Sequence, residues 1–568
     1  MGDSFIIAVD FGTAYSGYAF NITSRDKELE PTVKYWGKEY GRETPKTPTC
    51  ILFDKDKQFI SFGFEAKETY VSRMGTEAKD NLFFESFKMS LYKRVSRTLD
   101  MKIKAMNGKE MKALQVFTEA LKFLKEDALK YIAQHTAGKQ FTASDFTWVL
   151  TVPAIWDNSA KEFMREAATQ AGIVTKEKED KLIIALEPEA ASVYCKKLPS
   201  DGFIAENLGN LKLDQSPGTQ YIVVDCGGGT IDITVHEVLE GGNLKELNKA
   251  SGNDLGGQTV DRKFKEFLQE IFTGVWHDYE KKFPSEVQKI MYDFTLFKRH
   301  EDDVEIPCPF NLGRMAEKKK KIEKYFKKVQ GATWDEGVIK ISKEKLREFF
   351  EESLQGITQS ITEVFQKQFK IKYILLVGGY ADSEILPNHI TDAFIDDCKI
   401  LCPFKPQEAI VKGAVEFGRN KGVVASRKNP FTYGLGISQR FDKFRHRDDK
   451  KYTNKDGVWC RDIFMKLVDV GEDVRWNETR EHILYPVEAA EKAMSFSFYR
   501  TKKKHVTYID ESDTEEIGSL VVESPDTTFG LDREIRLKIK FGFTEMTATG
   551  TDRESGSTQT IKLNFMRK

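Results

Sequence analysis

The amino-acid sequence predicts an α/β protein with a duplicated, two-lobed domain followed by a β-rich domain. Two similar segments, 6–13 and 222–232, indicate the duplication, and their aspartates, Asp10 and Asp225, lie 215 residues apart. Each segment is a short apolar run that ends in Asp and continues through glycine to threonine. Apolar runs alternate with amphipathic helical patterns before the composition shift at 425–430, as in α/β proteins, and a period of two prevails after it.

Length and composition set the broad class. At 568 residues the chain exceeds the size of one hydrophobic core, so we expect at least two domains. The 87 Lys and Arg nearly balance the 88 Asp and Glu, which gives no reason to expect nucleic acid or an anionic membrane as a partner. No run is apolar enough for membrane insertion, and Met1–Phe5 has no basic region typical of a signal peptide. We expect a cytoplasmic location, with the nucleus as a further one.

The seven cysteines are scattered along the chain without paired spacing. Cys398 and Cys402 are the nearest pair, but no His or second Cys pair accompanies them as a zinc site would require. Reduced thiols, typical of a cytosolic protein, are therefore the favoured interpretation.

The first lobe is expected to alternate strands with helices. The strand at 148–152 ends at Pro153, and the helix at 158–171 is closed by Gly172. Pro188 stands where a helix start tolerates proline, which indicates a helix running on through Ala190. The other expected elements are strands at 6–9, 18–22, 50–53 and 182–186 and a long helix at 115–134.

The second lobe begins with a strand in the repeated segment. Residues 198–218 are rich in Gly, Pro, Asp and Asn and should form a surface loop. A further strand at 373–377 runs into the pair Gly378 and Gly379. Helices are expected at 264–297, 314–329, 344–369 and 408–418.

The remainder of the chain shows strand-like periodicity. Residues 533–541 alternate polar and apolar side chains, as a half-exposed antiparallel strand does. We predict a nucleotide-binding domain at 1–425, with lobes 1–187 and 188–425, and a β-rich domain at 430–568. Its expected strands are 431–437, 494–499, 518–522, 535–541, 546–550 and 559–565, with no long helix after them.

The repeated segments carry residue types that suit a polyphosphate. Glycines let the chain turn sharply and bring backbone N–H groups against phosphate oxygens. An Asp at each strand end can hold Mg²⁺ through water, because this ion dehydrates reluctantly. Threonine hydroxyls add contacts to phosphate or water. We therefore predict a nucleoside triphosphate with Mg²⁺, gripped from both sides of one cleft.

Five segments in the right order resemble motifs of the 70-kDa heat-shock protein family. They are the first phosphate loop (8–17), a Val-Pro-Ala segment (150–154), a connecting segment (187–191), the second phosphate loop (225–232, continued by Gly256, Gly257 and Asp261) and the adenosine motif (378–379). The resemblance implies the nucleotide-domain fold that this family shares with actin and sugar kinases, with ATP or ADP and Mg²⁺ as its ligands. Residues 184–192 and 429–436 are most similar to the divergent type-12 branch. The β-rich part resembles a shortened peptide-binding sandwich.

The resemblance also implies residue roles. Asp10 and Asp225 hold the magnesium waters, and Lys67 stabilises charge on the transferred phosphate, with a solvated surface lysine as the alternative. The implied catalytic residues are Asp10, Lys67, Glu187, Asp225, Thr230 and Asp232. The implied nucleotide contacts are Gly12, Thr13, Ala14, Tyr15, Gly227, Gly228, Gly229, Gly256, Gly257, Glu317, Lys320, Lys321, Gly378, Gly379 and Ser383.

The basic run 318–321 allows more than one interpretation. A motif scan would score it as a nuclear signal, but an expected helix at 317–328 is similar to the family's adenosine-contacting helix. That likeness gives Glu317, Lys320 and Lys321 their ribose or base roles. For Lys318 and Lys319 a solvated helix face is the alternative.

Three departures from the family pattern accompany the resemblance. The two arginines that sandwich adenine are missing, since Lys321 replaces one and 378–384 lacks the other, and lysine does not stack on a flat ring as guanidinium does. The linker at 423–428 is basic and lacks the family's acidic-leucine pattern. The helical lid and the acidic tail are also missing. We expect altered nucleotide affinity and no trapping of substrate under a lid.

Three functions fit these observations. The first is a slow Mg-ATPase, a chaperone-like protein whose nucleotide state biases the β-rich domain toward or away from a polypeptide client or protein partner, with a nucleotide-exchange factor as a further partner. The second is a nucleotide-binding interaction scaffold that scarcely hydrolyses ATP. The third is a sugar kinase, which the second phosphate loop and the β-rich part disfavour. Fold alone does not separate them.

Overall fold

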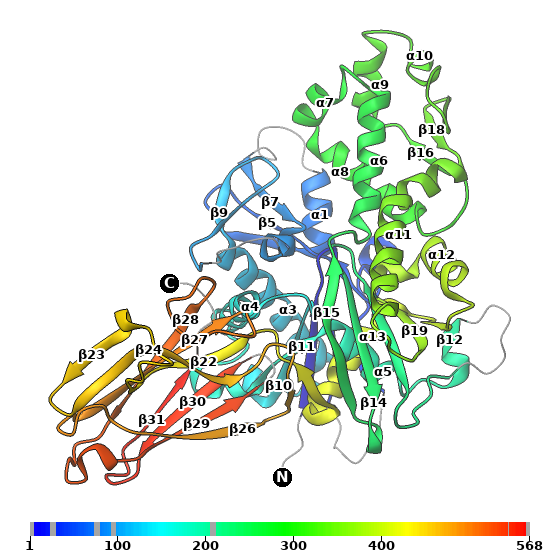
Figure 1. The fold of residues 1–568 in the computed structure, drawn as a ribbon. Helices are drawn as coiled ribbons and strands as arrows, with labels where there is room; N and C mark the ends of the chain where they lie inside the picture. The colour runs from blue at the N-terminus through cyan, green and yellow to red at the C-terminus, as the bar shows by residue number, and fades with distance from the viewer. Residues whose placement is uncertain are drawn as a thin grey trace.

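A computed structural model describes residues 5–22, 30–72, 80–92, 98–204, 212–542 and 545–563. Figure 1 shows two α/β lobes, the first in blue and cyan and the second in green, with the β-rich domain in orange and red beside them. No helix of the described residues is long and apolar enough to cross a membrane.

The first lobe is built on a mixed sheet of order β11-β10-β1-β2-β3, with β4 paired to β2. Its strands are β1 (Phe5–Phe11), β2 (Tyr15–Asn21), β3 (Thr32–Val33), β4 (Thr47–Pro48), β10 (Phe146–Val152) and β11 (Leu182–Leu186). The apolar faces of α3 (Ala113–His135) and α4 (Asn158–Gln170) share one hydrophobic core with this sheet. The hairpin of β1 and β2 places Asp10 opposite Gly17, where the first phosphate loop begins.

A smaller sheet sits above the first lobe in the order β6-β5-β7. It comprises β5 (Cys50–Phe53), β6 (Phe59–Phe62) and β7 (Leu82–Glu85), and α1 (Gly63–Ser72) follows β6 directly. A hairpin of β8 (Lys102–Lys104) and β9 (Glu110–Lys112) completes this part.

The second lobe repeats the plan in an eight-stranded sheet of order β12-β20-β19-β13-β14-β15-β21-β25. The hairpin of β13 and β14 places Asp225 opposite Asp232, and β13 runs parallel to β19 as β1 runs parallel to β10. The strands are β12 (Phe203–Ile204), β13 (Gln220–Cys226), β14 (Ile231–Val238), β15 (Leu244–Asn253), β19 (Ile371–Val377), β20 (Lys399–Pro403), β21 (Val424–Lys428) and β25 (Asp473–Arg475). The predicted duplication is therefore present in the fold.

The upper part of the second lobe is mainly helical and corrects two predicted helices. The helix expected at 264–297 is divided into α6 (Gln258–Ile271), α7 (Trp276–Lys282) and α8 (Pro284–Phe297), because Gly274 has a φ of +79° and Pro284 begins a new helix. The helix expected at 314–329 is interrupted after Glu317. The further elements are α9 (Phe310–Glu317), α10 (Glu323–Phe326), α11 (Lys343–Phe365), α12 (Ile385–Phe394) and the small sheet of β16 (Val304–Pro307), β18 (Val338–Ile341) and β17 (Ala332–Asp335).

Two helices pack against each other and share one hydrophobic core with the main sheets of both lobes. They are α5 (Glu187–Cys195) and α13 (Pro406–Arg419). A Cβ on Gly413 would lie 1.7 Å from the Ala190 carbonyl oxygen, so this close packing requires glycine. Because α5 begins with Glu187, the packing also fixes the position of a predicted site residue.

The β-rich domain is a sandwich of two antiparallel sheets, β23-β24-β22-β27-β28 and β26-β29-β30-β31. Apolar side chains of both sheets form its core. The strands are β22 (Thr432–Arg440), β23 (Lys451–Asn454), β24 (Gly457–Val468), β26 (Thr479–Leu484), β27 (Ala493–Thr501), β28 (Glu515–Glu523), β29 (Ile535–Phe541), β30 (Met546–Asp552) and β31 (Thr558–Lys562). The sequence pattern missed β23, β24 and β26. Of the strand expected at 559–565, Asn564 and Phe565 lie outside the described residues.

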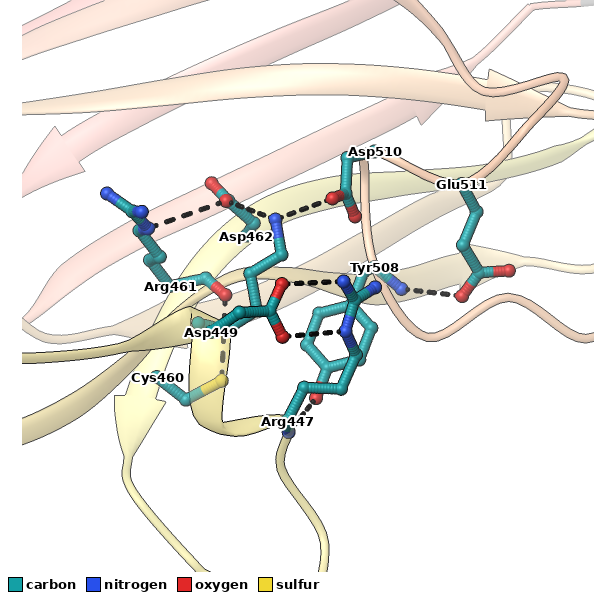
Figure 2. Close-up of polar contacts among 9 residues, drawn as sticks. Arg447, Asp449, Cys460, Arg461, Asp462, Tyr508, Asp510 and Glu511 are labelled. Carbon is teal, nitrogen blue, oxygen red and sulfur yellow. Dashed lines mark hydrogen bonds and ion pairs between the residues drawn. The ribbon is translucent and has the colours of Figure 1, made fainter.

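A polar cluster braces the β23–β24 end of the sandwich (Figure 2). Lys450 Nζ pairs with Asp462 at 2.8 Å and Asp510 at 2.6 Å, and so joins β24 to the segment after β27. The Arg447 guanidinium donates two hydrogen bonds to Asp449, and the Arg447 N–H donates to the Tyr508 hydroxyl at 2.9 Å. Each charged group drawn has a partner within the cluster, so we interpret the cluster as a structural brace.

The predicted linker is a strand of the second lobe. β21 runs parallel to β15 and antiparallel to β25, which comes from beyond the expected domain boundary. Because β25 comes from the β-rich part of the chain, the sheet of the second lobe contains strands from both sides of the expected domain boundary.

Candidate functional site

A cavity of about 460 Å³ lies between the two lobes. Residues of both repeated segments line it, together with α1, α6 and α8. The predicted site residues that line it are Asp10, Gly12, Thr13, Ala14, Tyr15, Lys67, Glu187, Asp225, Gly227, Gly228, Gly229, Thr230, Gly257, Gly378, Gly379 and Ser383.

The two glycine loops meet across this cavity. A Cβ on Gly228 would lie 2.6 Å from the Ala14 Cβ, and one on Gly229 would lie 2.8 Å from Thr13 Oγ1. Side chains at these positions would therefore push the lobes apart. Glycine is required here for close approach, and the same absence of side chains leaves backbone N–H groups accessible to a ligand.

The second loop is fixed by the start of α6. Gly257 N–H donates to the Gly227 carbonyl at 3.1 Å, and Gln258 N–H donates to the Gly228 carbonyl at 2.8 Å. Gly256 does not line the cavity but supports it, since a Cβ there would lie 2.7 Å from both carbonyl oxygens.

Asp10 is buried at the end of β1 and both of its oxygens are engaged. Lys46 Nζ donates to Asp10 Oδ2 at 2.6 Å, and Thr151 Oγ1 donates to Oδ1 at 3.1 Å. Lys46 also lines the cavity. Sequence reasoning did not find Lys46, because a lysine in a connecting loop has the pattern of a surface residue.

Glu187 is paired with a second buried lysine. Lys88 Nζ, which follows β7 in the chain, donates to Glu187 Oε1 at 2.7 Å. Burial raises the pKa of Glu187 to about 7, although Lys88 opposes this shift. Lys88 was likewise missed from the sequence.

Among the described residues, no lysine or arginine forms an ion pair with Asp225 or Asp232. Asp225 Oδ1 and Asp232 Oδ2 are buried without a hydrogen-bond partner. Burial and then the neighbouring carboxylate of Glu187 raise the pKa of Asp225 well above its ordinary value. Burial also raises the pKa of Asp232, which the Ile155 N–H opposes by donating to Oδ1 at 2.9 Å. Asp232 lies behind the cavity wall.

Lys67 reaches the cavity from α1. Its Nζ lies 4.9 Å from the centroid of the Tyr292 ring on α8, a cation–π contact between the lobes. This places its charge at the cavity, as the sequence predicted, and not on an open surface.

Gly378 closes the floor of the cavity after β19. It has a φ of +91°, and a Cβ there would lie 2.5 Å from Asp225 Oδ1. Gly379 and Ser383 line the same wall. The Ser383 hydroxyl donates to the Tyr380 carbonyl at 3.0 Å, which fixes the turn.

The expected adenosine contacts on 317–321 are corrected by the structure. Glu317, Lys320 and Lys321 do not line the cavity; Glu317 instead lines a separate surface groove with Phe310 and Trp334. The end of α8 takes their expected place with Thr295, Lys298 and Arg299. Residues 317–321 instead lie at the end of α9 and before α10, apart from the cavity, whereas the end of α8 faces it.

The new cationic side chains are held by acids. Lys298 Nζ donates to Asp261 Oδ1 at 2.6 Å and to the Gly257 carbonyl at 2.8 Å. Arg299 pairs with Asp382 at 3.5 Å. An arginine is therefore present at this end of the cavity, contrary to the departure inferred from Lys321.

Comparison with known proteins decides the family. A family model described as Hsp70 protein matches residues 7–419. The chain belongs to the Hsp70 family. It is 33% identical to heat shock 70 kDa protein 12A of mouse and of human, over 99% of this chain and 91% of each relative. It is 32% identical to human heat shock 70 kDa protein 12B over the same shares, and 23% identical to the chaperone protein DnaK of Thermosipho melanesiensis over 76% of this chain and 63% of that protein.

Hsp70 proteins bind ATP and ADP with magnesium, and the acidic cluster fits this ion in part. No group of three or more His, Cys, Asp or Glu among the described residues is arranged to hold a metal directly. The unpartnered oxygens of Asp225 and Asp232 fit a hydrated cation. Asp10 differs from them, because Lys46 Nζ and Thr151 Oγ1 already donate one hydrogen bond to each of its oxygens. Among the described residues, the buried oxygens of this cluster that lack a hydrogen-bond partner therefore belong to the second lobe.

Proposed function

We propose that this Hsp70-family chain binds ATP and ADP in the cavity, hydrolyses ATP slowly, and uses the bound nucleotide to regulate how its β-rich domain binds a polypeptide or protein partner. One observation carries the proposal: two glycine loops from duplicated lobes meet across a cavity that holds both carboxylates and lysines.

Each part of the cavity has a role in this proposal. Backbone N–H groups of 12–15 and 227–229 hold the polyphosphate, since accessible N–H groups bind phosphate oxygens. Lys67 stabilises charge that develops on the transferred phosphate, and Glu187, which lines the cavity, orients the attacking water. Magnesium, when bound beside Asp225, supplies charge neutralisation of the phosphates.

The adenosine end is assigned to Arg299, Lys298 and the Gly378–Gly379 turn. A planar guanidinium can stack on a base, which an ammonium cannot. Asp261 holds Lys298 at the mouth of this region.

Coupling to the β-rich domain is supported by its contacts with both lobes. Asn158 Nδ2 donates to the Tyr433 hydroxyl at 3.1 Å, and Lys562 Nζ pairs with Glu179 at 2.9 Å. Through β25, which pairs with β21, the domain also shares the sheet of the second lobe. A movement of the lobes around a nucleotide would therefore change contacts of the sandwich. From the family resemblance we also propose a polypeptide client, a nucleotide-exchange factor and a cytoplasmic or nuclear location.

A second candidate is a scaffold that binds nucleotide and scarcely hydrolyses it. Lys46 and Lys88 favour it, because they pair with two of the four carboxylates expected to organise the attacking water and its metal. A sugar kinase has no such support, as the Hsp70 model covers residues 7–419.

Single-turnover hydrolysis of ATP by the purified chain separates the first two candidates. We expect slow turnover that falls about 100-fold in Lys67→Ala, the scale for losing one transition-state contact, and also in Asp10→Asn. ATP binding measured by calorimetry on the same proteins is the control. Binding without hydrolysis above the level of the two variants would favour the scaffold.

A further inference from the structure

We propose that Lys46 is a built-in cation of the phosphate clamp, which allows the cavity to bind nucleotide without a divalent cation. The inference rests on the proposed nucleotide binding and names the positive charge that the site uses.

The position of Lys46 relative to Asp10 is the first observation. Its Nζ lies 2.6 Å from Asp10 Oδ2, and the two side chains are 9% and 2% exposed. Because Thr151 donates to the other oxygen, both oxygens of Asp10 already accept a hydrogen bond from the protein, where the family resemblance has them ordering the water shell of a metal ion. The carboxylate that should order this shell instead orders an ammonium.

The first phosphate loop itself shapes the site of Lys46. Thr44 Oγ1 donates to the Lys46 carbonyl at 2.7 Å, and the next residues form β4, which pairs with Tyr15 and Ser16. Gly17 makes room for this approach, since a Cβ there would lie 2.7 Å from the Pro45 carbonyl oxygen and 3.1 Å from Lys46 Cγ. The glycine loop thus binds the lysine segment as well as facing the cavity.

The charge of Lys46 acts on both lobes. It opposes the burial and the neighbouring carboxylates that raise the pKa of Asp225, the second aspartate of the repeat. Lys46 therefore lies where its charge is felt by both of the aspartates expected to hold magnesium waters.

Lys46 can bridge protein and ligand. An ammonium has three N–H donors, and the contact with Asp10 uses one of them. Since Lys46 lines the cavity, its remaining donors can meet a phosphate oxygen there. Lys88 acts in parallel at Glu187, with a side chain only 2% exposed. Two fixed ammonium groups thus offset two of the four carboxylates before any ion binds.

The test is calorimetric binding of ADP and of ATP in EDTA and in magnesium. For the unmodified chain we expect dissociation constants that differ less than about 3-fold between the two conditions. For Lys46→Met we expect binding in EDTA to weaken about 10-fold or more, as a charge-assisted contact to phosphate is lost, and magnesium to restore part of it. Lys55→Met removes an exposed lysine outside the cavity and should match the unmodified chain.

The double variant Asp10→Asn/Lys46→Met guards against misfolding, because Lys46→Met alone leaves a buried carboxylate unpaired. It removes both charges, and we expect it to need magnesium for binding as Lys46→Met does. Binding by the unmodified chain only with magnesium would overturn the inference and leave the proposed function intact, as would a folded single or double variant that binds equally well in EDTA. No binding under either condition would overturn the proposed function too.

Discussion

Glu246 illustrates at the scale of one residue how the fold changes the chemistry of a charged group. It lies on β15, is 4% exposed, and accepts a hydrogen bond from Lys428 N–H at 3.0 Å. Burial and then Glu189 raise its pKa to about 7, while Arg427, the Lys428 N–H and Lys161 oppose the shift. The charged form of Glu246 is therefore disfavoured in the folded protein at neutral pH.

This shift predicts a pH dependence of stability. Because the folded pKa of about 7 exceeds the unfolded value of 4.5, the folded state holds its proton more tightly. The contribution of Glu246 to the free energy of unfolding is greatest below pH 4.5 and falls as pH rises toward 7, by up to about 3 kcal/mol. Glu246→Gln keeps an acceptor but cannot ionise, so this variant should lose less stability than the unmodified chain between pH 5 and 7.5.

Thermal unfolding of both proteins across this pH range is the measurement. Glu240→Gln, at an exposed position, is the control and should follow the unmodified chain. The same pH dependence in Glu246→Gln and the unmodified chain would contradict the assignment.

Some site residues can be recognised from their neighbours in the sequence, and others cannot. Asp10 and Asp225 were predictable because strand, turn and threonine stand next to each other in the chain. Lys46 and Lys88 were not, because their carboxylate partners lie 36 and 99 positions away. The sequence around such a lysine does not indicate that the folded protein buries its side chain.

Strand β21 is the element that connects the nucleotide lobes with the β-rich domain. Arg427 lies on this strand and makes a bidentate ion pair with Glu189 of α5, with Nε and Oε1 2.6 Å apart. Glu189 is fully buried and stands two residues after Glu187, which lines the cavity. The basic character of the linker, which departs from the family's acidic-leucine pattern, thus provides the contact that docks it.

Breaking this pair should loosen β21. Arg427→Met leaves the Glu189 charge buried and unpaired, which costs about 3–5 kcal/mol, so we expect a lower melting temperature and faster proteolysis at 421–430. Lys428→Met is the matched control: its Nζ pairs with Asp473 at 2.8 Å near the surface, a contact worth about 1 kcal/mol at most.

A double-mutant cycle with Glu189→Gln completes this test. The variant Glu189→Gln/Arg427→Met should recover much of the stability that Arg427→Met loses. Equal proteolysis of Arg427→Met and Lys428→Met would show that the ion pair does not hold the strand.

Elements were predictable where their pattern is local. The strands at 50–53, 182–186 and 535–541 have the expected bounds. The helix expected at 264–297 failed because its apolar pattern continues through two turns. β21 and β25 are short; β21 pairs with β15, about 180 positions earlier, and β25 pairs with β21.

At the scale of the whole molecule, two similar lobes enclose one cavity and a sandwich contacts both of them. The repeat in the sequence predicted the lobes and the cavity between them. It could not predict how the sandwich sits, since that depends on single contacts such as Asn158 with Tyr433 and Lys562 with Glu179. The central claim is that the cavity is a two-sided clamp for a nucleotide.

Calorimetric titration of ATP into the unmodified chain and into Gly228→Ala tests this claim most directly. An added Cβ would lie 2.6 Å from the Ala14 Cβ and force the loops apart. Gly313→Ala, where the nearest atom would be 3.9 Å away, is the control. We predict that the chain and Gly313→Ala bind one ATP with equal affinity and that Gly228→Ala, still folded, binds about 10-fold more weakly or worse, the cost of overpacking a tight contact. Equal ATP binding by all three proteins, or none by the unmodified chain, would contradict the account.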